Sequence, residues 1–333
     1  MPSIIITGSQ GFIGSYLCNE FLDAGYDVTG IDNYSKYGNV SRSHDKHERF
    51  ILLRHDLAKS FPDISADYII AGAAMIGGIT YFHKYAYDLL STNERILANT
   101  FDSAIRSYKE NILKRIVVLS SSMVFENTDK YPTPEDEVSK APPPSSTYGF
   151  QKLSSEYFAK GANEQYGLPY TIIRPFNCVG VGEEEAIGEE KVYSGNIKML
   201  MSHVLPDLVY KALCLDADDP LPILGDGMQV RHYTHGKDIA RGVRLALESE
   251  DGINNDFNIS TSVSTSVREL AYIVWNTIHG KNPSIVGSSS YEYDVRLRSP
   301  DVSKAKRVLG FEANISLQDS VNEVVEHMRS KND

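Results

Sequence analysis

The chain contains little cysteine, little tryptophan and no excess of positive charge. Among its 333 residues are three cysteines and one tryptophan. The spacing of Cys18, Cys178 and Cys214 fits neither a disulfide framework nor a metal site. We therefore expect no bound metal, and we interpret Cys18 as a small core residue on a helix. The formal net charge of −11 argues against a nucleic-acid partner and against an anionic membrane surface.

Long apolar runs are also missing. No segment reaches the roughly 18 consecutive apolar residues that a membrane-spanning helix needs. The sequence opens directly in a predicted strand, which leaves no room for a signal peptide. These two absences predict a soluble, cytoplasmic protein with no membrane partner. Acidic clusters at 183–185, 189–190 and 216–219 are interpreted as solvated loops.

The amino-terminal segment carries the most informative pattern. A β-branched run, Ile4-Ile5-Ile6-Thr7, leads into three glycines at a spacing of three: Gly8, Gly11 and Gly14. An amphipathic helix is predicted over 15–24, and a second apolar stretch ends at Asp32. This order of strand, glycine turn, helix, strand and acid is typical of a dinucleotide-binding unit.

Each part of this unit has a physical role. The glycines allow a tight turn, close approach of the backbone to a pyrophosphate, and close packing of helix on strand. The free N–H groups of the helix N-terminus point at the phosphates. We expect the Asp32 carboxylate to accept hydrogen bonds from the adenosine ribose hydroxyls. Because a carboxylate repels a 2′-phosphate, this position favours NAD over NADP.

Strand and helix patterns alternate through the first half of the chain, as in a doubly wound parallel sheet. The predicted strands are 3–7, 27–31, 50–55, 68–71, 115–119 and 170–174. The longest predicted helices are 89–108 and 148–166, and the proline-rich stretch 131–146 is predicted to be a loop. Further helices are predicted at 203–213, 237–247, 267–279 and 316–328.

The pattern of the second half indicates a smaller lobe. We therefore predict an α/β protein with a Rossmann-type doubly wound parallel sheet and an interleaved α/β lobe that caps the substrate. The NAD-binding domain is predicted to comprise 1–176 and about 235–262. The lobe that caps it is predicted to comprise 177–234 and 263–333. Ligands of such open sheets bind at the carboxyl ends of the strands, where this lobe would lie.

Two further motifs carry chemistry. Tyr148 and Lys152 are four residues apart on a predicted helix, so their side chains share one face. A phenol with a pKa of about 10 is a poor base at neutral pH. A nearby ammonium and an oxidised nicotinamide ring are expected to lower that pKa, so that Tyr148 accepts a proton while hydride leaves. Three serines, Ser120 to Ser122, follow the strand at 115–119 and would face the ligand.

With these motifs the chain resembles the extended short-chain dehydrogenase/reductase family, specifically its nucleotide-sugar epimerases and dehydratases. The matching residues are Gly8, Gly11, Gly14, Asp32, Asp56, Leu57, Ala73, Ala74, Asn93, Ser121, Tyr148, Lys152, Arg174, Asn177, Arg231, Arg298, Asp301 and Lys304. The resemblance implies NAD as cofactor, a nucleotide-diphosphate sugar as substrate, and a homodimer formed by the helices 89–108 and 148–166.

The resemblance also implies a site, residue by residue. The implied catalytic residues are Ser121, Tyr148 and Lys152. The implied cofactor contacts are Gly8, Gly11, Phe12, Ile13, Gly14, Asp32, Asn33, Asp56, Leu57, Ala71, Ala73, Asn93, Tyr148, Lys152 and Pro175. The implied substrate contacts are Ser122, Met123, Asn177, His203, Val204, Arg231 and Arg298. In this scheme the guanidinium groups of the two arginines grip the diphosphate in a fork geometry.

Departures from the family pattern narrow the choice of reaction. A 4,6-dehydratase would have an Asp-Glu pair at Ser122 and Met123, and a decarboxylase would have glutamate at Met123. A 3,5-epimerase/reductase would have a cysteine at position 123. This chain has Met123 there, and a thioether cannot act as a base. His203, in contrast, matches the histidine of that group. The remaining chemistry is 4-epimerisation through a transient 4-keto sugar. A dehydratase, decarboxylase or 3,5-epimerase/reductase stays open as an alternative, as does a non-catalytic NAD-binding sensor.

Two other departures concern the neighbourhood of the catalytic residues. Phe125 and Glu126 replace the Tyr-Gly pair that follows the catalytic serine in the family. Thr147 stands before Tyr148 where the family has proline, so Ser145, Ser146 and Thr147 are expected to offer additional hydroxyls near the sugar.

Overall fold

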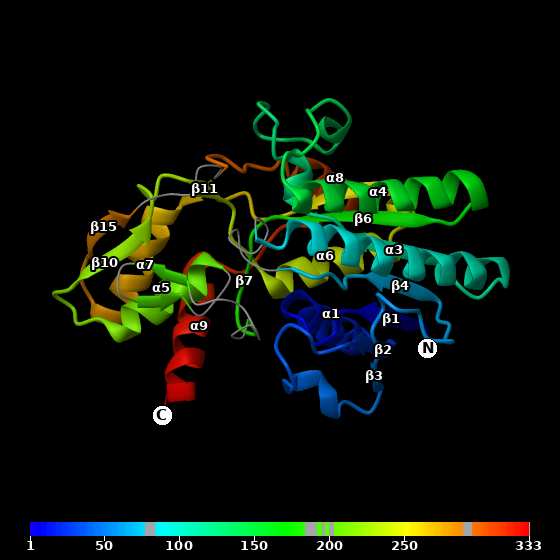
Figure 1. Cartoon of the computed structure of the whole chain (residues 1–333), viewed down its shortest axis with the longest axis horizontal. Coiled ribbons are helices and arrows are strands. Elements are labelled where there is room, and N and C mark those ends of the chain that lie inside the picture. Colours follow the sequence, from blue (N-terminus) through cyan, green and yellow to red (C-terminus); the bar gives the residue numbers. More distant parts are fainter. Residues whose placement is uncertain (77–83, 184–191, 195–196, 200–202, 289–294, 333) are drawn as a thin grey trace.

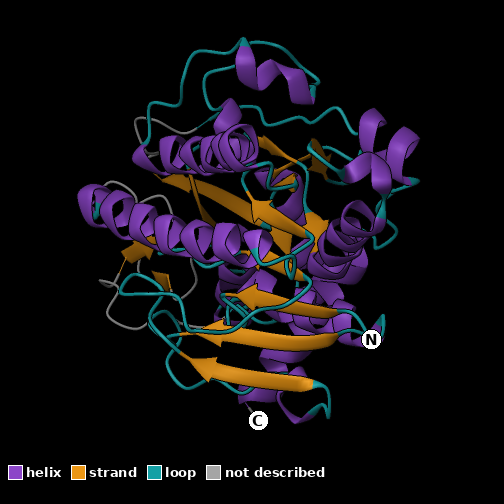
Figure 2. Cartoon of the chain, turned by 90° about the vertical axis from the view of Figure 1, so that its right-hand side faces the viewer, coloured by secondary structure: helices purple, strands orange, loops and turns teal. Residues whose placement is uncertain are grey.

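The central sheet has seven parallel strands in the order β3-β2-β1-β4-β5-β6-β13 (Figure 2). The computed structural model describes residues 1–76, 84–183, 192–194, 197–199, 203–288 and 295–332. The strands are β1 (Ser3–Thr7), β2 (Asp27–Asp32), β3 (Phe50–Arg54), β4 (Tyr68–Ala71), β5 (Arg115–Leu119), β6 (Tyr170–Pro175) and β13 (Asn255–Ile259). Strand order reverses beside β1, so a crevice for ligands is expected at the carboxyl ends of β1 and β4.

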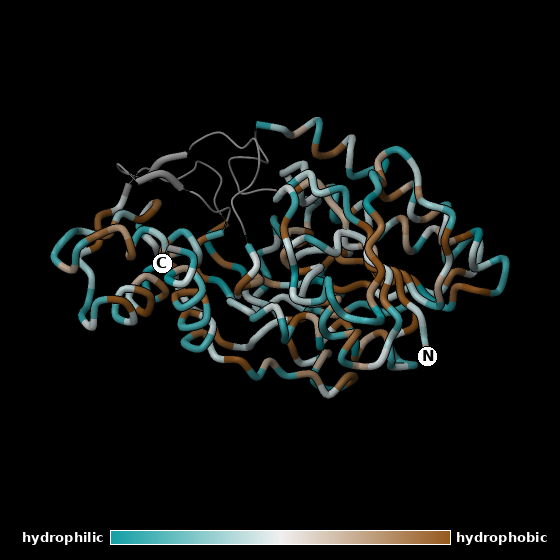
Figure 3. The backbone as a smooth tube through the Cα atoms, turned by 90° about the horizontal axis from the view of Figure 1, so that it is seen from below, coloured by the Kyte–Doolittle hydropathy of each residue, from teal (hydrophilic) through white to brown (hydrophobic). Residues whose placement is uncertain are grey.

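Helices cover both faces of this sheet. They are α1 (Phe12–Asp23), α3 (Ala86–Lys109), α4 (Thr147–Tyr166) and α6 (Gly236–Glu248). Ile4 and Ile6 point to the face that packs on α1 and α6, whereas Ile5 points to the face that packs on α3 and α4. This alternation follows from the two-residue period of a strand. The most hydrophobic parts of the chain accordingly gather in the sheet (Figure 3).

A second lobe lies beyond the carboxyl ends of the strands (Figure 1). It contains α5 (Val204–Cys214), α7 (Val267–His279), α9 (Leu317–Asn332) and the parallel pair of β10 (Pro220–Leu224) with β15 (Ser284–Ser288). Its core is built around the fully buried Trp275. The short strands of the connecting region are β7 (Cys178–Val179), β8 (Val192–Ser194), β9 (Ile197–Met199), β11 (Val230–Arg231), β12 (Thr234–His235) and β14 (Thr265–Ser266).

The predicted doubly wound α/β architecture is confirmed. Several elements escaped the sequence analysis, among them the sheet strand β13 and the short helix α8 (Ser303–Leu309). The strand was missed because its sequence, NDFNI, begins with polar residues, whereas buried parallel strands are usually apolar runs. Its polar side chains are tolerated because Asp256 and Asn258 bond to charged and backbone groups of other elements.

Several local predictions can be compared directly with the structure. Cys18 is fully buried in the core, as predicted for a small apolar residue. The helix α1 begins at Phe12, three residues earlier than predicted, immediately after the glycine turn. The proline-rich stretch 131–146 holds only a short 3₁₀ helix, η3 (Glu135–Ser139). Within the residues described, no helix is long and apolar enough to cross a membrane.

Candidate active site

The glycine turn between β1 and α1 has no room for side chains. A Cβ on Gly14 would lie 1.9 Å from the carbonyl oxygen of Gly8. Gly8 has a φ of +76°, and a Cβ there would lie 3.0 Å from the Cα of Ala73 on the neighbouring strand end. Gly11 caps α1 without a side-chain hydrogen bond, so no capping side chain takes up the first N–H groups of the helix. This cradle fits a dinucleotide pyrophosphate.

Asp32 ends β2 beside this turn. Its Oδ2 accepts from the Gln10 N–H at 3.0 Å, and its Oδ1 accepts from the Tyr34 N–H at 2.7 Å. Burial raises the pKa of the carboxyl group, while these hydrogen bonds and the nearby Arg42 oppose that rise. The guanidinium of Arg42 donates two hydrogen bonds to the Gln10 carbonyl oxygen. The turn and the carboxylate are thereby held in one fixed arrangement.

The other expected cofactor contacts lie at the same edge of the sheet. Asn33 follows β2, Asp56 and Leu57 follow β3, Ala71 and Ala73 lie at or after the end of β4, and Pro175 ends β6. The Thr7 hydroxyl oxygen accepts from the N–H groups of Gly72 and Ala73, which ties the ends of β1 and β4 together. The Asn93 side chain bonds both backbone polar groups of Met75, at 2.6 and 3.0 Å.

The three expected catalytic residues meet at the end of β5. Ser121 caps the 3₁₀ helix η2 (Ser122–Phe125) by accepting from the Met123 N–H at 3.2 Å, and its side chain is hydrogen-bonded to the Tyr148 phenol. The Lys152 ammonium donates to the Leu119 carbonyl oxygen at 2.9 Å. Tyr148 and Lys152 are only 7% and 8% exposed. The arrangement brings a hydroxyl, a phenol and an ammonium together out of bulk water.

Burial acts on the electrostatics of both Tyr148 and Lys152. Burial raises the pKa of the Tyr148 phenol, and the Ser121 hydrogen bond and Arg298 oppose that rise. The ammonium of Lys152 lies 5.9 Å from the centroid of the Tyr148 ring. Burial lowers the pKa of the ammonium itself to about 8, and the group is turned toward the Leu119 carbonyl. In the protein alone the effect of burial on the phenol outweighs these two opposing effects, and a bound cationic nicotinamide ring would lower the pKa.

The sequence analysis missed a third contact between α4 and the end of β5. Glu156 follows Lys152 by four residues on the same helix face and accepts from the Ser120 hydroxyl at 2.6 Å. The same carboxylate receives two hydrogen bonds at 2.7 Å from the fully buried Arg174. Consecutive residues 119, 120 and 121 are thus each held by one side chain of α4. The regular four-residue spacing of 148, 152 and 156 was the available signal.

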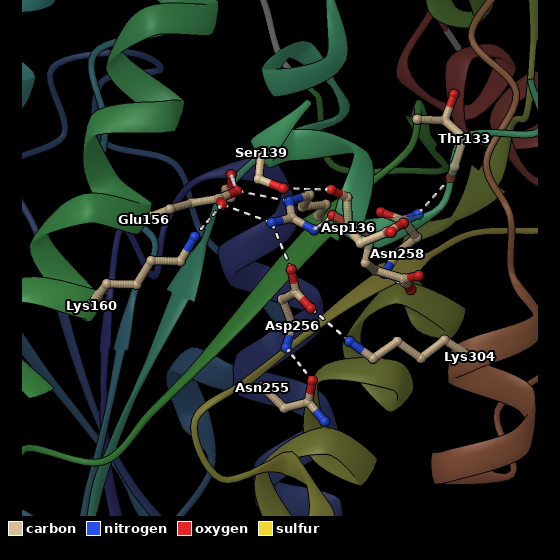
Figure 4. A network of polar contacts seen from close by, with 12 residues as sticks. Thr133, Asp136, Ser139, Glu156, Lys160, Asn255, Asp256, Asn258 and Lys304 are labelled. Carbon is tan, nitrogen blue, oxygen red and sulfur yellow. Dashed lines mark hydrogen bonds and ion pairs between the residues drawn. The ribbon is translucent and has the colours of Figure 1, made fainter. Parts of the chain in front are cut away.

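A chain of charges, fully buried at Glu156 and Arg174, continues from this contact (Figure 4). Arg174 also pairs with Asp256 of β13 at 2.8 Å, and Asp256 pairs with Lys304 of α8 at 2.6 Å. The Asn258 N–H donates to the buried Glu135 carboxylate at 2.9 Å. The carboxylates raise the pKa of Arg174 above its ordinary value despite burial. The network joins the β5 end to β13 and α8, two of the elements that sequence reasoning missed.

The expected substrate contacts divide into two groups. Ser122 and Arg298 line one cavity, whereas the Met123 side chain packs against Leu89 and Tyr148. The complete lining of the cavity is Ser122, Phe125, Glu126, Thr128, Tyr131, Thr133, Phe176, Leu297, Arg298 and Ser299. Arg231 is buried and lies, with Arg298, close enough to Tyr131 to lower the pKa of its phenol against the effect of burial. The structure therefore brings both arginines to one region.

The remaining candidates lie at the entrance to the second lobe. Asn177 has a φ of +37° and a buried Oδ1 with no hydrogen-bond partner among the described residues. His203 caps α5, ahead of Val204, and its Nδ1 lies 2.7 Å from the Glu183 carboxylate. Glu183 is buried, so its interpretation as part of a solvated loop was wrong: the imidazole pairs with it. Residues 184–185 and 189–190 lie outside the described residues.

The fold and the site together define a short-chain dehydrogenase/reductase type of centre: a dinucleotide cradle beside a partly buried serine and a buried tyrosine and lysine. A model of the NAD dependent epimerase/dehydratase family matches residues 4–260, and the chain belongs to this family. NAD is the cofactor, as predicted, and the open cradle and the Asp32 carboxylate fit it.

Individual relatives differ in reaction. The chain is 27% identical to a putative UDP-glucose 4-epimerase of Methanocaldococcus jannaschii over 99% of each chain. It is 26% identical to a UDP-N-acetyl-alpha-D-glucosaminuronate decarboxylase of Bacillus cytotoxicus, over 98% of this chain and 97% of the relative. Among solved structures, a UDP-glucuronic acid 4-epimerase from Bacillus cereus in complex with UDP-glucuronic acid and NAD matches with a TM-score of 0.79 and 26% identity over 99% of each chain.

Proposed function

We propose that this protein is an NAD-dependent nucleotide-sugar 4-epimerase. The observation that carries the proposal is the side chain beside the phenol: Met123 packs directly against Tyr148 and Leu89. A thioether neither donates nor removes a proton, so elimination of water or loss of a carboxylate has no acid or base at this position. Inversion at C4 needs no acid or base at this position. Relatives that are 4-epimerases by name support the same reading.

The residues of the cradle are proposed to hold the cofactor. The Gly8–Gly14 turn would receive the pyrophosphate, Asp32 the adenosine ribose, and Lys152 the nicotinamide ribose. NAD supplies reversible acceptance of the hydride from C4 of the sugar. Asn93 would act on the site indirectly, because both of its side-chain hydrogen bonds hold the backbone of Met75.

The chain's own residues move the proton. Tyr148 is proposed to accept the proton of the sugar O4 hydroxyl and to return it after the ring has turned over. Ser121 holds the phenol by a hydrogen bond and would hold O4 in the same way. Burial of Tyr148 and Lys152 excludes water that would compete for either proton. Arg231 and Arg298 are proposed to grip the diphosphate while the sugar turns.

The direct test is product formation. Purified protein with NAD is incubated with UDP-, GDP-, dTDP- and CDP-sugars, and interconversion of 4-epimers is followed by NMR. We expect turnover with at least one nucleotide sugar, and loss of turnover without loss of NAD binding in Tyr148→Phe. Tyr157→Phe, an exposed tyrosine on the same helix, is the matched control and should remain active. Failure of every donor in the panel would overturn the proposal.

The two competing functions give different readouts in the same assay. A dehydratase, decarboxylase or reductase would release a product of different mass, or would change the absorbance of reduced nicotinamide in proportion to substrate. A sensor would bind NAD and convert nothing. The retained hydrogen bond between Ser121 and Tyr148 favours the enzyme.

We also propose a homodimer formed by α3 and α4. Both helices expose large aromatic side chains: Tyr87 is 77% exposed, Phe150 50% and Tyr157 68%. A second copy of this face would bury them. Light scattering should give about twice the chain mass of 37.1 kDa, and Tyr157→Lys should shift the protein toward monomer. A monomeric wild-type protein would refute this arrangement.

The predicted division into domains is retained as a proposal with one extension. The sheet strand β13 and the helix α6 fall inside the segment 235–262, which agrees with its assignment to the NAD-binding domain. The helix α8 packs back on that domain through the pair of Lys304 with Asp256. Limited proteolysis that releases 177–234 separately from the sheet residues would support the division.

A further inference from the structure

Glu126 occupies the junction between the two catalytic elements. It follows η2, which Ser121 caps, and its Oε2 accepts from both the N–H and the hydroxyl of Ser146 at 2.9 Å. The Ser146 hydroxyl oxygen in turn accepts from the Gly149 N–H at 3.0 Å and so caps α4, the helix that carries Tyr148. The Ser146 hydroxyl is therefore engaged in the cap, and the carboxylate of Glu126 is held in place from one side.

The same side chain lines the cavity beside the catalytic serine. Glu126 shares this cavity with Ser122, Tyr131 and Arg298. Its two hydrogen bonds both come from Ser146, and no cation forms an ion pair with it within the part of the chain that the structure describes. The carboxylate thus brings a negative charge to the wall of the cavity without a cationic partner among these residues.

Under the proposed function, the positive charges near Glu126 bind the diphosphate of the substrate. A nucleotide diphosphate carries about two negative charges, and the two arginines assigned to it are Arg231 and Arg298. Once the diphosphate is bound, the guanidinium of Arg298 is neutralised by it and does not offset Glu126. A second anionic group on the substrate that entered the cavity would then face the carboxylate, and like charges repel.

We propose that Glu126 makes this site selective for nucleotide sugars with an uncharged hexose and rejects uronic acid sugars. The inference rests on the proposed 4-epimerase function. During 4-epimerisation the sugar turns over between two hydride transfers, so the substituent on C5 is presented to both sides of the site. A hydroxymethyl group in the cavity can donate a hydrogen bond to Glu126, whereas a carboxylate there meets a like charge.

The test compares two donors that differ only at C6, UDP-glucose and UDP-glucuronate. We expect the wild-type protein to favour UDP-glucose in kcat/KM by about 10-fold or more. In Glu126→Gln the amide oxygen can still accept from Ser146, and only the negative charge is removed. It should raise the kcat/KM ratio of the uronate to the neutral sugar by about the same factor. Asp129→Asn, which removes an exposed charge three residues away, is the control and should leave the ratio unchanged.

Binding separates failure of this inference from failure of the proposed function. Calorimetry on Tyr148→Phe with NAD measures the affinity for each donor without turnover, in the presence or absence of the Glu126→Gln change. Tighter binding of UDP-glucose that disappears with the added change supports the inference even if no epimerisation is found. Equal binding of both donors, or a preference for the uronate, overturns it. If Glu126→Gln does not fold, the preference of Tyr148→Phe alone between UDP-glucose and UDP-glucuronate decides the question.

Discussion

Removal of the Ser120 hydroxyl tests whether α4 positions the catalytic end of β5. In Ser120→Ala the hydrogen bond to Glu156, 2.6 Å long and fully buried, is lost. Glu156 keeps both hydrogen bonds from Arg174, so its charge remains paired. The change therefore breaks one link of the network and leaves the others intact.

The magnitude follows from the type of bond. A hydrogen bond to a charged group contributes about 1.5–3 kcal/mol to the free energy of unfolding. We expect Ser120→Ala to lower stability by about this amount, well below the 3–5 kcal/mol for breaking a buried ion pair. Because the next residue is Ser121, part of the loss should appear at the catalytic site. A tenfold fall in kcat corresponds to about 1.4 kcal/mol, and we expect a fall of that size with little change in KM.

The assay is the pH profile of kcat, measured together with thermal unfolding. The Ser121 hydrogen bond lowers the pKa of Tyr148, so a loosened Ser121 should move the acidic limb of the profile to higher pH. The matched control is Thr171→Val, which removes a buried hydroxyl that donates to the Gly252 carbonyl oxygen at 2.7 Å. Thr171 lies near the amino end of β6, away from the catalytic edge. The Thr171→Val protein should be less stable than the wild type and should keep the wild-type pH profile of kcat.

Two results would refute this reasoning. A Ser120→Ala protein with unchanged kcat and an unchanged acidic limb would show that the bond to Glu156 serves stability alone. A shifted profile in Thr171→Val would show that any loss of stability disturbs the site.

Three further changes have defined outcomes. Burial lowers the pKa of Lys152 from 10.5 to about 8, so its charged form destabilises the fold most below pH 8 and not at all above the unfolded pKa. Lys152→Met should therefore raise the melting temperature of NAD-free protein at pH 7 but not near pH 11, and abolish turnover. In Gly14→Ala the new Cβ meets the Gly8 carbonyl oxygen, and calorimetry should show lost NAD binding. Arg298→Lys should raise KM for the nucleotide sugar about 10-fold, since an ammonium cannot form the bidentate contact, without changing NAD affinity.

The parts of the protein that sequence reasoning predicted well are local. The glycine turn, the helix after it and Asp32 lie within one stretch of chain, and their geometry follows from backbone freedom and strand period. Tyr148 and Lys152 share a helix face because four residues make about one turn. The strand β13 was missed for the opposite reason, because its polar residues are stabilised by partners far away in the sequence.

The predictions that needed correction depend on which distant groups meet. Glu183 was assigned to solvent but is buried against His203. The sequence analysis did not foresee the Leu119 partner of Lys152, whose ammonium lies 5.9 Å from the Tyr148 ring centroid and donates to the Leu119 carbonyl oxygen. In each case residue type and spacing identified a capable group, and the partner was set by packing between elements.

The sequence by itself determined the cofactor and the doubly wound sheet, and it placed Tyr148 and Lys152 on one helix face, because these follow from local spacing and from the alternation of strands and helices. Only the tertiary structure decided that α4 holds three consecutive residues of the β5 end, and that Glu126 shares a cavity with Arg298. These contacts join segments that are distant in the chain. Their geometry depends on how whole helices and strands pack, which no local pattern specifies.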